Sequence, residues 1–257
     1  MLAWAAALAP MVAMLLRTAS AQPIPPSVLP GLGPGAARVP VDVDQWPWRG
    51  VVRVQTEVGT RCTGALVGPR TVLTAAHCLF GRGTGRLLQP GSVHVLAGYA
   101  NGDYAGHARA ISIVTGPGFA VGPDMRPPPS ASPGADWAVL RLDAPLGTAD
   151  RVLPLARRAL PAGTAAMLGG YEQDRAQAMV ADLACALTGL VQDAAGYLLL
   201  RHSCAGTRGI SGAPLLARAE DGRWVIAGVA SVAGVGTSGG YAVPVSAIDL
   251  DVLAAAR

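Results

Sequence analysis

The chain has 257 residues, of which 51% are hydrophobic and only 14% are charged, as is typical of a globular protein with a large core. Its net charge of +4 rests on arginines that are scattered along the chain, because lysine is absent, so we expect no nucleic-acid-binding surface. The 33 glycines and 21 prolines favour many short strands joined by turns over long helices.

The first 21 residues have the pattern of a secretory signal peptide. Residues 2–16 are almost entirely apolar, and Ala19–Ser20–Ala21 fits a small-residue cleavage site. The alternative is an uncleaved membrane anchor, but the apolar run is shorter than the ~20 residues needed to span a bilayer. We therefore expect a secreted or periplasmic protein with no stable membrane association after the signal peptide is removed.

A segment rich in proline and glycine follows the signal peptide. We interpret residues 22–44 as a propeptide or flexible arm, in which Arg38–Val39 offers a peptide bond for processing. The remainder divides into two halves of similar style, residues 45–150 and residues 151–257.

Strand-like patterns recur along both halves and are separated by glycine-rich turns. They cover residues 51–54, 62–67, 71–75, 93–97, 110–114, 165–170, 184–190, 197–201, 224–232 and 240–245. One helix is predicted from Ser246, its N-cap, to Ala256. The sequence therefore predicts an all-β fold with a C-terminal helix.

Three short segments carry the residue types of a hydrolytic triad. His77 ends a buried strand, Asp136 precedes an apolar strand, and Ser211 lies in the turn 209–214 between two glycines. A serine hydroxyl needs a neighbouring base, and imidazole suits because its pKa lies near the working pH. The imidazole in turn needs an acceptor that fixes its tautomer. We assign Ser211 as nucleophile, His77 as general base and acid, and Asp136 as the group that orients His77.

Each of these residues has a simpler interpretation when it is taken alone. A serine between glycines can be only a turn, an aspartate before a strand is often solvated, and a histidine at a strand end is often structural. Their combination in the chain order His, Asp, Ser favours the triad. The N–H groups of Gly209 and Ser211 would then form the oxyanion hole. We interpret His94 and His107 as structural or solvated. For His202, which lies close before Cys204, we favour a structural role over the alternative that it approaches the substrate cleft.

The motifs TAAHC, DWAVL and GISGAP resemble, in this order, those of the chymotrypsin/trypsin family of serine peptidases, over about residues 45–250. Within this family the sequence most resembles bacterial secreted members such as the glutamyl endopeptidases. The resemblance implies two six-stranded antiparallel β-barrels with a C-terminal α-helix. It also implies a serine endopeptidase that cleaves polypeptides through an acyl-enzyme without a cofactor. No cysteine or histidine pair has the spacing of zinc ligands, so no metal is expected.

The four cysteines of an exported chain favour two disulfides over free thiols. The resemblance implies Cys62–Cys78 beside the catalytic histidine, and Cys185–Cys204 is similar to a bridge of bacterial relatives. It also implies an S1 pocket, which receives the substrate side chain before the scissile bond (P1), made by Ala205, Ser231, Val232, Ala233 and Gly239. None of these residues is acidic, which argues against arginine or lysine at P1, and Ala230 stands where the glutamyl endopeptidases have a histidine, so we expect uncharged P1 residues.

Ile210 is the main departure from the family pattern, because trypsin-like zymogens have an aspartate there that pairs with the new N-terminus. Isoleucine cannot accept an ammonium group, so we expect Ile210 to pack inward beneath the serine turn. This departure leaves an alternative open, a catalytically inactive homologue that acts as a binding protein. An α/β-hydrolase is less consistent with the sequence, since its serine would precede the aspartate and the histidine.

Overall fold

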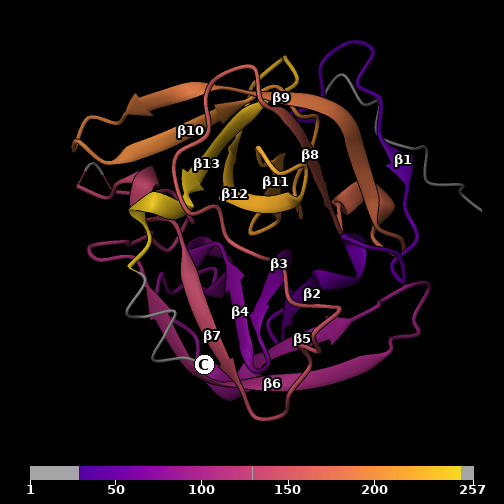
Figure 1. Ribbon diagram of the computed structural model, residues 1–257. Helices are drawn as coiled ribbons and strands as arrows, with labels where there is room; N and C mark the ends of the chain where they lie inside the picture. Colours follow the sequence, from indigo (N-terminus) through magenta and orange to yellow (C-terminus); the bar gives the residue numbers. More distant parts are fainter. Residues whose placement is uncertain (1–28, 129, 250–257) are drawn as a thin grey trace, which may run out of the picture.

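The computed structural model describes residues 29–128 and 130–249, which form two β-barrels, one above the other in Figure 1. The first barrel closes in the order β2-β3-β4-β7-β6-β5, and every pair of neighbouring strands is antiparallel. Its strands are β2 (Val51–Thr56), β3 (Arg61–Gly68), β4 (Thr71–Thr74), β5 (Val93–Ala97), β6 (Gly106–Thr115) and β7 (Ala138–Leu142).

The second barrel has the strand order β9-β10-β13-β12-β11-β8 and is closed by the pairing of β8 with β9. Its strands are β8 (Ala165–Gly170), β9 (Val180–Gln192), β10 (Leu198–His202), β11 (Pro214–Arg218), β12 (Trp224–Ala233) and β13 (Gly240–Pro244). A two-residue strand, β1 (Val39–Pro40), pairs with the start of β9 from outside the barrel. The predicted pair of six-stranded antiparallel barrels is confirmed.

The described helical segments are all short 3-10 turns. They are η2 (Trp48–Gly50), η3 (Ala76–Leu79), η4 (Pro90–Ser92), η5 (Pro133–Ala135), η6 (Gln173–Arg175) and η7 (Val245–Ala247). The predicted C-terminal helix is not confirmed, since η7 covers only its start and residues 250–257 lie outside the described residues, as does the predicted signal peptide. No helix in the described part of the chain is long and apolar enough to cross a membrane.

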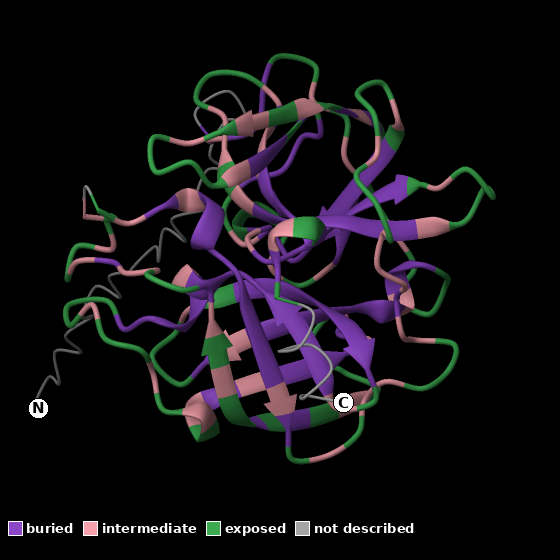
Figure 2. Cartoon of the chain, turned by 60° about the vertical axis from the view of Figure 1, so that its left-hand side comes forward, coloured by how far each residue is buried: buried purple, intermediate pink, exposed green. Residues whose placement is uncertain are grey.

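The core of the first barrel includes strands that are buried on both faces. On β2, Val51, Val52 and Val54 are fully buried, because one face points into the barrel and the other is covered by the rest of the molecule. The largest apolar cluster extends from these valines to Ile226 and Val243 of the second barrel. Figure 2 shows the buried residues concentrated on the strands and between the barrels. This continuous core fixes the two barrels against each other, which fixes the loops between them.

Candidate active site

His77 and Asp136 form a hydrogen-bonded pair at the edge of the first barrel. His77 lies in the turn η3 directly after β4, and Asp136 lies between η5 and β7, which pairs with β4. The His77 Nδ1 atom is 2.6 Å from Asp136 Oδ2, and the His77 backbone N–H donates to Asp136 Oδ1 at 2.8 Å. Ser231 Oγ, on β12 of the second barrel, donates to Asp136 Oδ2 at 2.5 Å. The carboxylate therefore accepts from both barrels, and its orientation is fixed.

The charges of this pair stabilise each other. Burial lowers the pKa of His77, but the charge and hydrogen bond of Asp136 outweigh it, so the pKa is raised above its usual value. Burial raises the pKa of Asp136, but His77 and the hydrogen bond from Ser231 outweigh it, so the pKa is lowered. Asp136 thus stays ionised at neutral pH, and its Oδ2 holds the proton of His77 on Nδ1, which leaves Nε2 as the basic nitrogen.

Ser211 lies on a loop of the second barrel that is hydrogen-bonded to the first. Its carbonyl oxygen accepts from the Thr63 N–H of β3 at 2.9 Å and lies 3.9 Å from the Cys78 sulfur, next to His77 in the chain. The following residue, Gly212, donates its N–H to the Ala230 carbonyl of β12 at 2.7 Å. These contacts bring the serine loop to the edge of the first barrel that carries His77.

Gly209 has a backbone conformation that only glycine adopts readily. Its φ angle is +98°, and a Cβ atom there would lie 2.3 Å from the Tyr171 carbonyl oxygen. Among the hydrogen bonds of the described residues, the N–H groups of Gly209 and Ser211 donate to no protein acceptor. Two backbone donors close to the serine are therefore free to receive an oxyanion.

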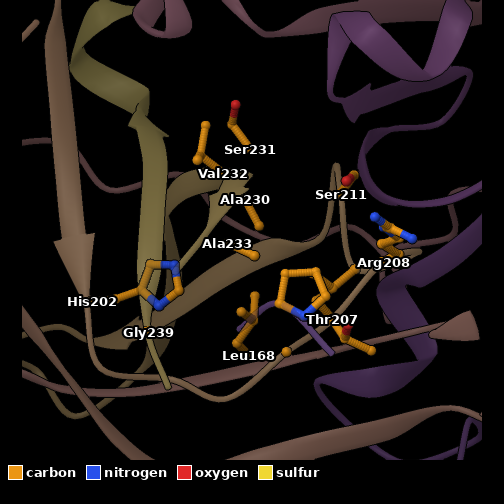
Figure 3. Close-up of a pocket in the computed structure, with 13 residues that line it drawn as sticks. Leu168, His202, Thr207, Arg208, Ser211, Ala230, Ser231, Val232, Ala233 and Gly239 are labelled. Atoms are coloured by element: carbon orange, nitrogen blue, oxygen red, sulfur yellow. The ribbon is translucent and has the colours of Figure 1, made fainter. Parts of the chain in front are cut away.

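A pocket of about 270 Å³ lies next to Ser211. Its lining includes Ser231, Val232, Ala233 and Gly239, four of the five residues predicted for S1, together with Pro30, Leu168, His202, Gly206, Thr207, Arg208, Ile210, Ser211 and Ala230. In Figure 3, Ser211 and Arg208 lie at one end of the view, and His202 and Gly239 lie at the other. Ala205, predicted as the floor, does not line the pocket, because it is buried against Leu29 and Leu32.

His202 is a pocket residue that the sequence interpretation treated as structural. The side chain is buried at the end of β10, and its Nδ1 has no hydrogen-bond partner among the described residues. Burial lowers the pKa of His202 to about 4, so the ring is neutral at pH 7. A signal was present, since His202 lies two residues before Cys204, but nothing in the spacing indicated which way the ring points. His94 and His107 instead stack on each other on β5 and β6.

Both expected disulfides are present, and they flank the two parts of the site. Cys62–Cys78 joins β3 to the turn that carries His77, and Cys185–Cys204 joins β9 to the segment that leads into the serine loop. Among the described residues, the one cluster with metal-ligand types is Cys62, Cys78 and His77, but its two sulfur atoms are bonded to each other. These three residues are therefore not a free thiolate ligand set.

Ile210 packs inward, as predicted. It is 6% exposed and belongs to an apolar cluster with the Cys185–Cys204 disulfide and Ala213. Its own N–H donates to the Thr207 carbonyl at 3.0 Å, and its carbonyl accepts from the Ala213 N–H at 2.9 Å. Hydrophobic packing thus supports the serine loop at the position where an aspartate would offer a charge.

The fold and this site define a two-barrel protein of the serine-peptidase type, and comparison with known proteins gives its family. The family model described as Trypsin matches residues 38–250, so the chain belongs to the trypsin family of serine peptidases. Tryptase of Mus musculus is 31% identical over 134 residues, which are 50% of this chain and 44% of that protein. Glutamyl endopeptidase of Bacillus licheniformis is 40% identical over 40 residues, which are 16% of this chain and 12% of that protein.

The matched regions span less than half the length of these curated relatives. A solved structure of a Glu endopeptidase in complex with MPD superimposes with a TM-score of 0.69 at 18% identity and covers 88% of this chain and 99% of that one. At this identity the structural likeness establishes the fold alone.

Proposed function

We propose that this chain is an exported serine endopeptidase in which Ser211, His77 and Asp136 form the catalytic triad. The observation that supports it best is the doubly hydrogen-bonded His77–Asp136 pair on the same barrel edge to which Thr63 of β3 binds the Ser211 carbonyl oxygen. The four cysteines, all in disulfides, agree with an oxidising compartment.

In the proposed mechanism, Ser211 Oγ attacks the carbonyl carbon of the scissile peptide bond, and its proton passes to His77 Nε2. The carbonyl oxygen becomes an oxyanion and receives hydrogen bonds from the N–H groups of Gly209 and Ser211. His77 then gives the proton to the leaving amine, and the C–N bond breaks to leave an acyl-enzyme. Water, deprotonated by His77, attacks the ester, and the proton returns to Ser211 as the acid product leaves.

The pocket beside Ser211 is proposed as the S1 pocket for uncharged P1 side chains. No acidic residue lines it, which argues against arginine or lysine, and its walls at Val232 and Ala233 are apolar. His202 contributes a neutral ring with an unpartnered nitrogen. A cleavage profile on a peptide library tests this, and a strong preference for basic or acidic P1 residues would contradict it.

Labelling with a fluorophosphonate tests activity against the alternative of an inactive binding homologue, because only an activated serine reacts. We expect stoichiometric labelling of the purified protein and of the exposed control Ser112→Ala, and none of Ser211→Ala at equal folding. Absence of labelling and of peptide hydrolysis in the folded wild-type protein would favour the inactive homologue.

A further inference from the structure

Arg38 connects the N-terminal arm, residues 29–38, to two acidic groups of the second barrel. Its Nη1 is 2.5 Å from Glu172 Oε2, and its Nη2 is 2.7 Å from Asp174 Oδ2. The Arg38 side chain is 10% exposed and the Glu172 side chain is fully buried. The guanidinium thus supplies a fixed positive charge to a carboxylate that water does not reach.

Glu172 in turn contacts the serine loop. Its Oε2 accepts from the Thr207 N–H at 2.7 Å, and the neighbouring Gln173 N–H donates to the Arg208 carbonyl at 2.7 Å. Thr207 and Arg208 directly precede Gly209, whose N–H is a proposed oxyanion donor. The segment that carries Glu172 therefore fixes the backbone immediately before the oxyanion hole.

This arrangement depends on the arginine. Burial raises the pKa of Glu172 to about 7, and the charge of Arg38 is the main influence that opposes this shift. The other carboxylate oxygen, Oε1, has no hydrogen-bond partner among the described residues. Without Arg38 the buried carboxyl group would retain only the Thr207 N–H, so it would either carry a charge without a counter-ion or take up a proton, and both changes disturb this acceptor.

The other end of the arm supports the same loop. The Gly31 N–H donates to the Gly234 carbonyl at 2.6 Å, and its own carbonyl accepts from the Gly206 N–H at 3.2 Å. A Cβ atom at position 31 would lie 1.9 Å from the Gly206 carbonyl oxygen, so only glycine fits. Pro30 lines the pocket, and Leu29 and Leu32 bury Ala205. The arm therefore connects Gly206, on one side of the pocket, with Gly234, which follows the pocket residue Ala233.

We propose that Arg38 is a positioning residue that orders the oxyanion loop through Glu172, so that the arm stays attached in the active enzyme. Ile210 cannot pair with a cation, unlike the aspartate of trypsin-like zymogens. In this chain the ion pair beside the loop is formed by Glu172, and its cation is the Arg38 side chain instead of a new N-terminus. The proposal rests on the proposed peptidase activity. It predicts that cleavage at Arg38–Val39, which would free the arm, inactivates the enzyme.

The test compares full-length wild-type protein with Arg38→Gln, Arg38→Lys and the control Arg158→Gln, which removes an exposed arginine paired with Glu220. For Arg38→Gln we expect kcat to fall roughly 10- to 100-fold with little change in KM, because part of the oxyanion stabilisation is lost. Arg38→Lys should fall less, since its point charge replaces one of the two contacts. Arg158→Gln should match the wild type.

A double variant separates positioning from general destabilisation. In Arg38→Gln/Glu172→Gln the buried charge at position 172 is removed together with its partner, and only the partly exposed Asp174 loses its ion pair. The amide oxygen at position 172 can still accept from Thr207. We expect this variant to recover a large part of the kcat lost by Arg38→Gln. Equal kcat of Arg38→Gln and wild type, or no recovery in the double variant, would overturn the proposal.

The test also gives an answer if Arg38→Gln does not fold or if the wild-type protein is inactive. If Arg38→Gln does not fold, Arg38→Lys decides, because a reduced kcat at unchanged KM supports the proposal and an unchanged kcat overturns it. If the folded wild-type protein itself neither hydrolyses peptides nor reacts with a fluorophosphonate, the proposed function fails, and this result is distinct from an active wild type that is insensitive to Arg38.

Discussion

The two barrels position their parts of the site in different ways. In the first barrel, His77 and Asp136 directly flank paired strands and are bonded to each other through both backbone and side chain. In the second, Ser211 lies on an irregular loop that depends on packing by Ile210, a disulfide and the N-terminal arm. A side chain at the end of a strand is held in place by the hydrogen bonds of the sheet, whereas a loop is ordered only by contacts with several neighbouring segments.

The largest expected effect concerns the His77–Asp136 pair of the first barrel. Asp136→Asn should lower kcat on the order of 10⁴-fold with the fold intact, because an amide can favour the wrong histidine tautomer and cannot stabilise the imidazolium. Steady-state kinetics on one peptide measure this effect. Asp143→Asn, which changes an exposed aspartate whose side chain accepts from the Arg109 N–H of the same barrel, is the control. A loss below about tenfold for Asp136→Asn would mean that this pair does not serve catalysis.

The two disulfides allow a direct comparison of the barrels. They close loops of similar sequence separation, 16 and 19 residues, so removal of either should cost about 3 kcal/mol of unfolding free energy. Both double alanine variants should be less active, but kcat should fall further without Cys185–Cys204, because His77 keeps its bonds to Asp136. Urea unfolding and kinetics together measure this, and a larger kcat loss without Cys62–Cys78 would reverse the comparison.

His202 makes stability depend on pH. Its pKa is lowered to about 4 in the folded chain by burial, against about 6.5 in an unfolded chain. Between these values only the unfolded chain takes up the proton, so the free energy of unfolding falls as pH drops from about 6.5 to about 4. His202→Gln should show a flatter dependence in this window and a constant difference from wild type above it. Parallel slopes of the two proteins would show that His202 does not titrate in this way.

The smallest effect tests the packing beneath the serine loop. Ile210→Val should cost about 1 kcal/mol of unfolding free energy and lower kcat slightly, because a methyl group is lost under the oxyanion turn. Ile226→Val, in the larger core and fully buried, should cost a similar free energy without changing kcat. If both variants leave kcat unchanged, the serine loop does not depend on this packing.

Motifs with fixed local geometry could be predicted from the sequence. The strand patterns predicted an all-β fold, the family motifs implied the two barrels, and the glycines around Ser211 indicated a tight turn. Contacts between distant segments could not be predicted, because the sequence around Arg38 does not indicate that it pairs with Glu172, and the reverse also holds. Ala205 was expected to line the pocket, yet residues 29–32, which the composition assigned to a propeptide or flexible arm, cover it. The orientation of the His202 side chain could not be predicted either, since a strand end allows a side chain to face either way, and the structural role was favoured over the approach to the cleft that the pocket shows.

The most direct test of the account is a double-mutant comparison of kcat for Ser211→Ala, His77→Ala and the two combined. Because nucleophile and base act as one unit, each single change should lower kcat on the order of 10⁴- to 10⁶-fold, and the double variant should be little worse than either. Near-normal turnover by purified Ser211→Ala, or losses that multiply in the double variant, would contradict the assignment of Ser211 and His77 to one catalytic unit.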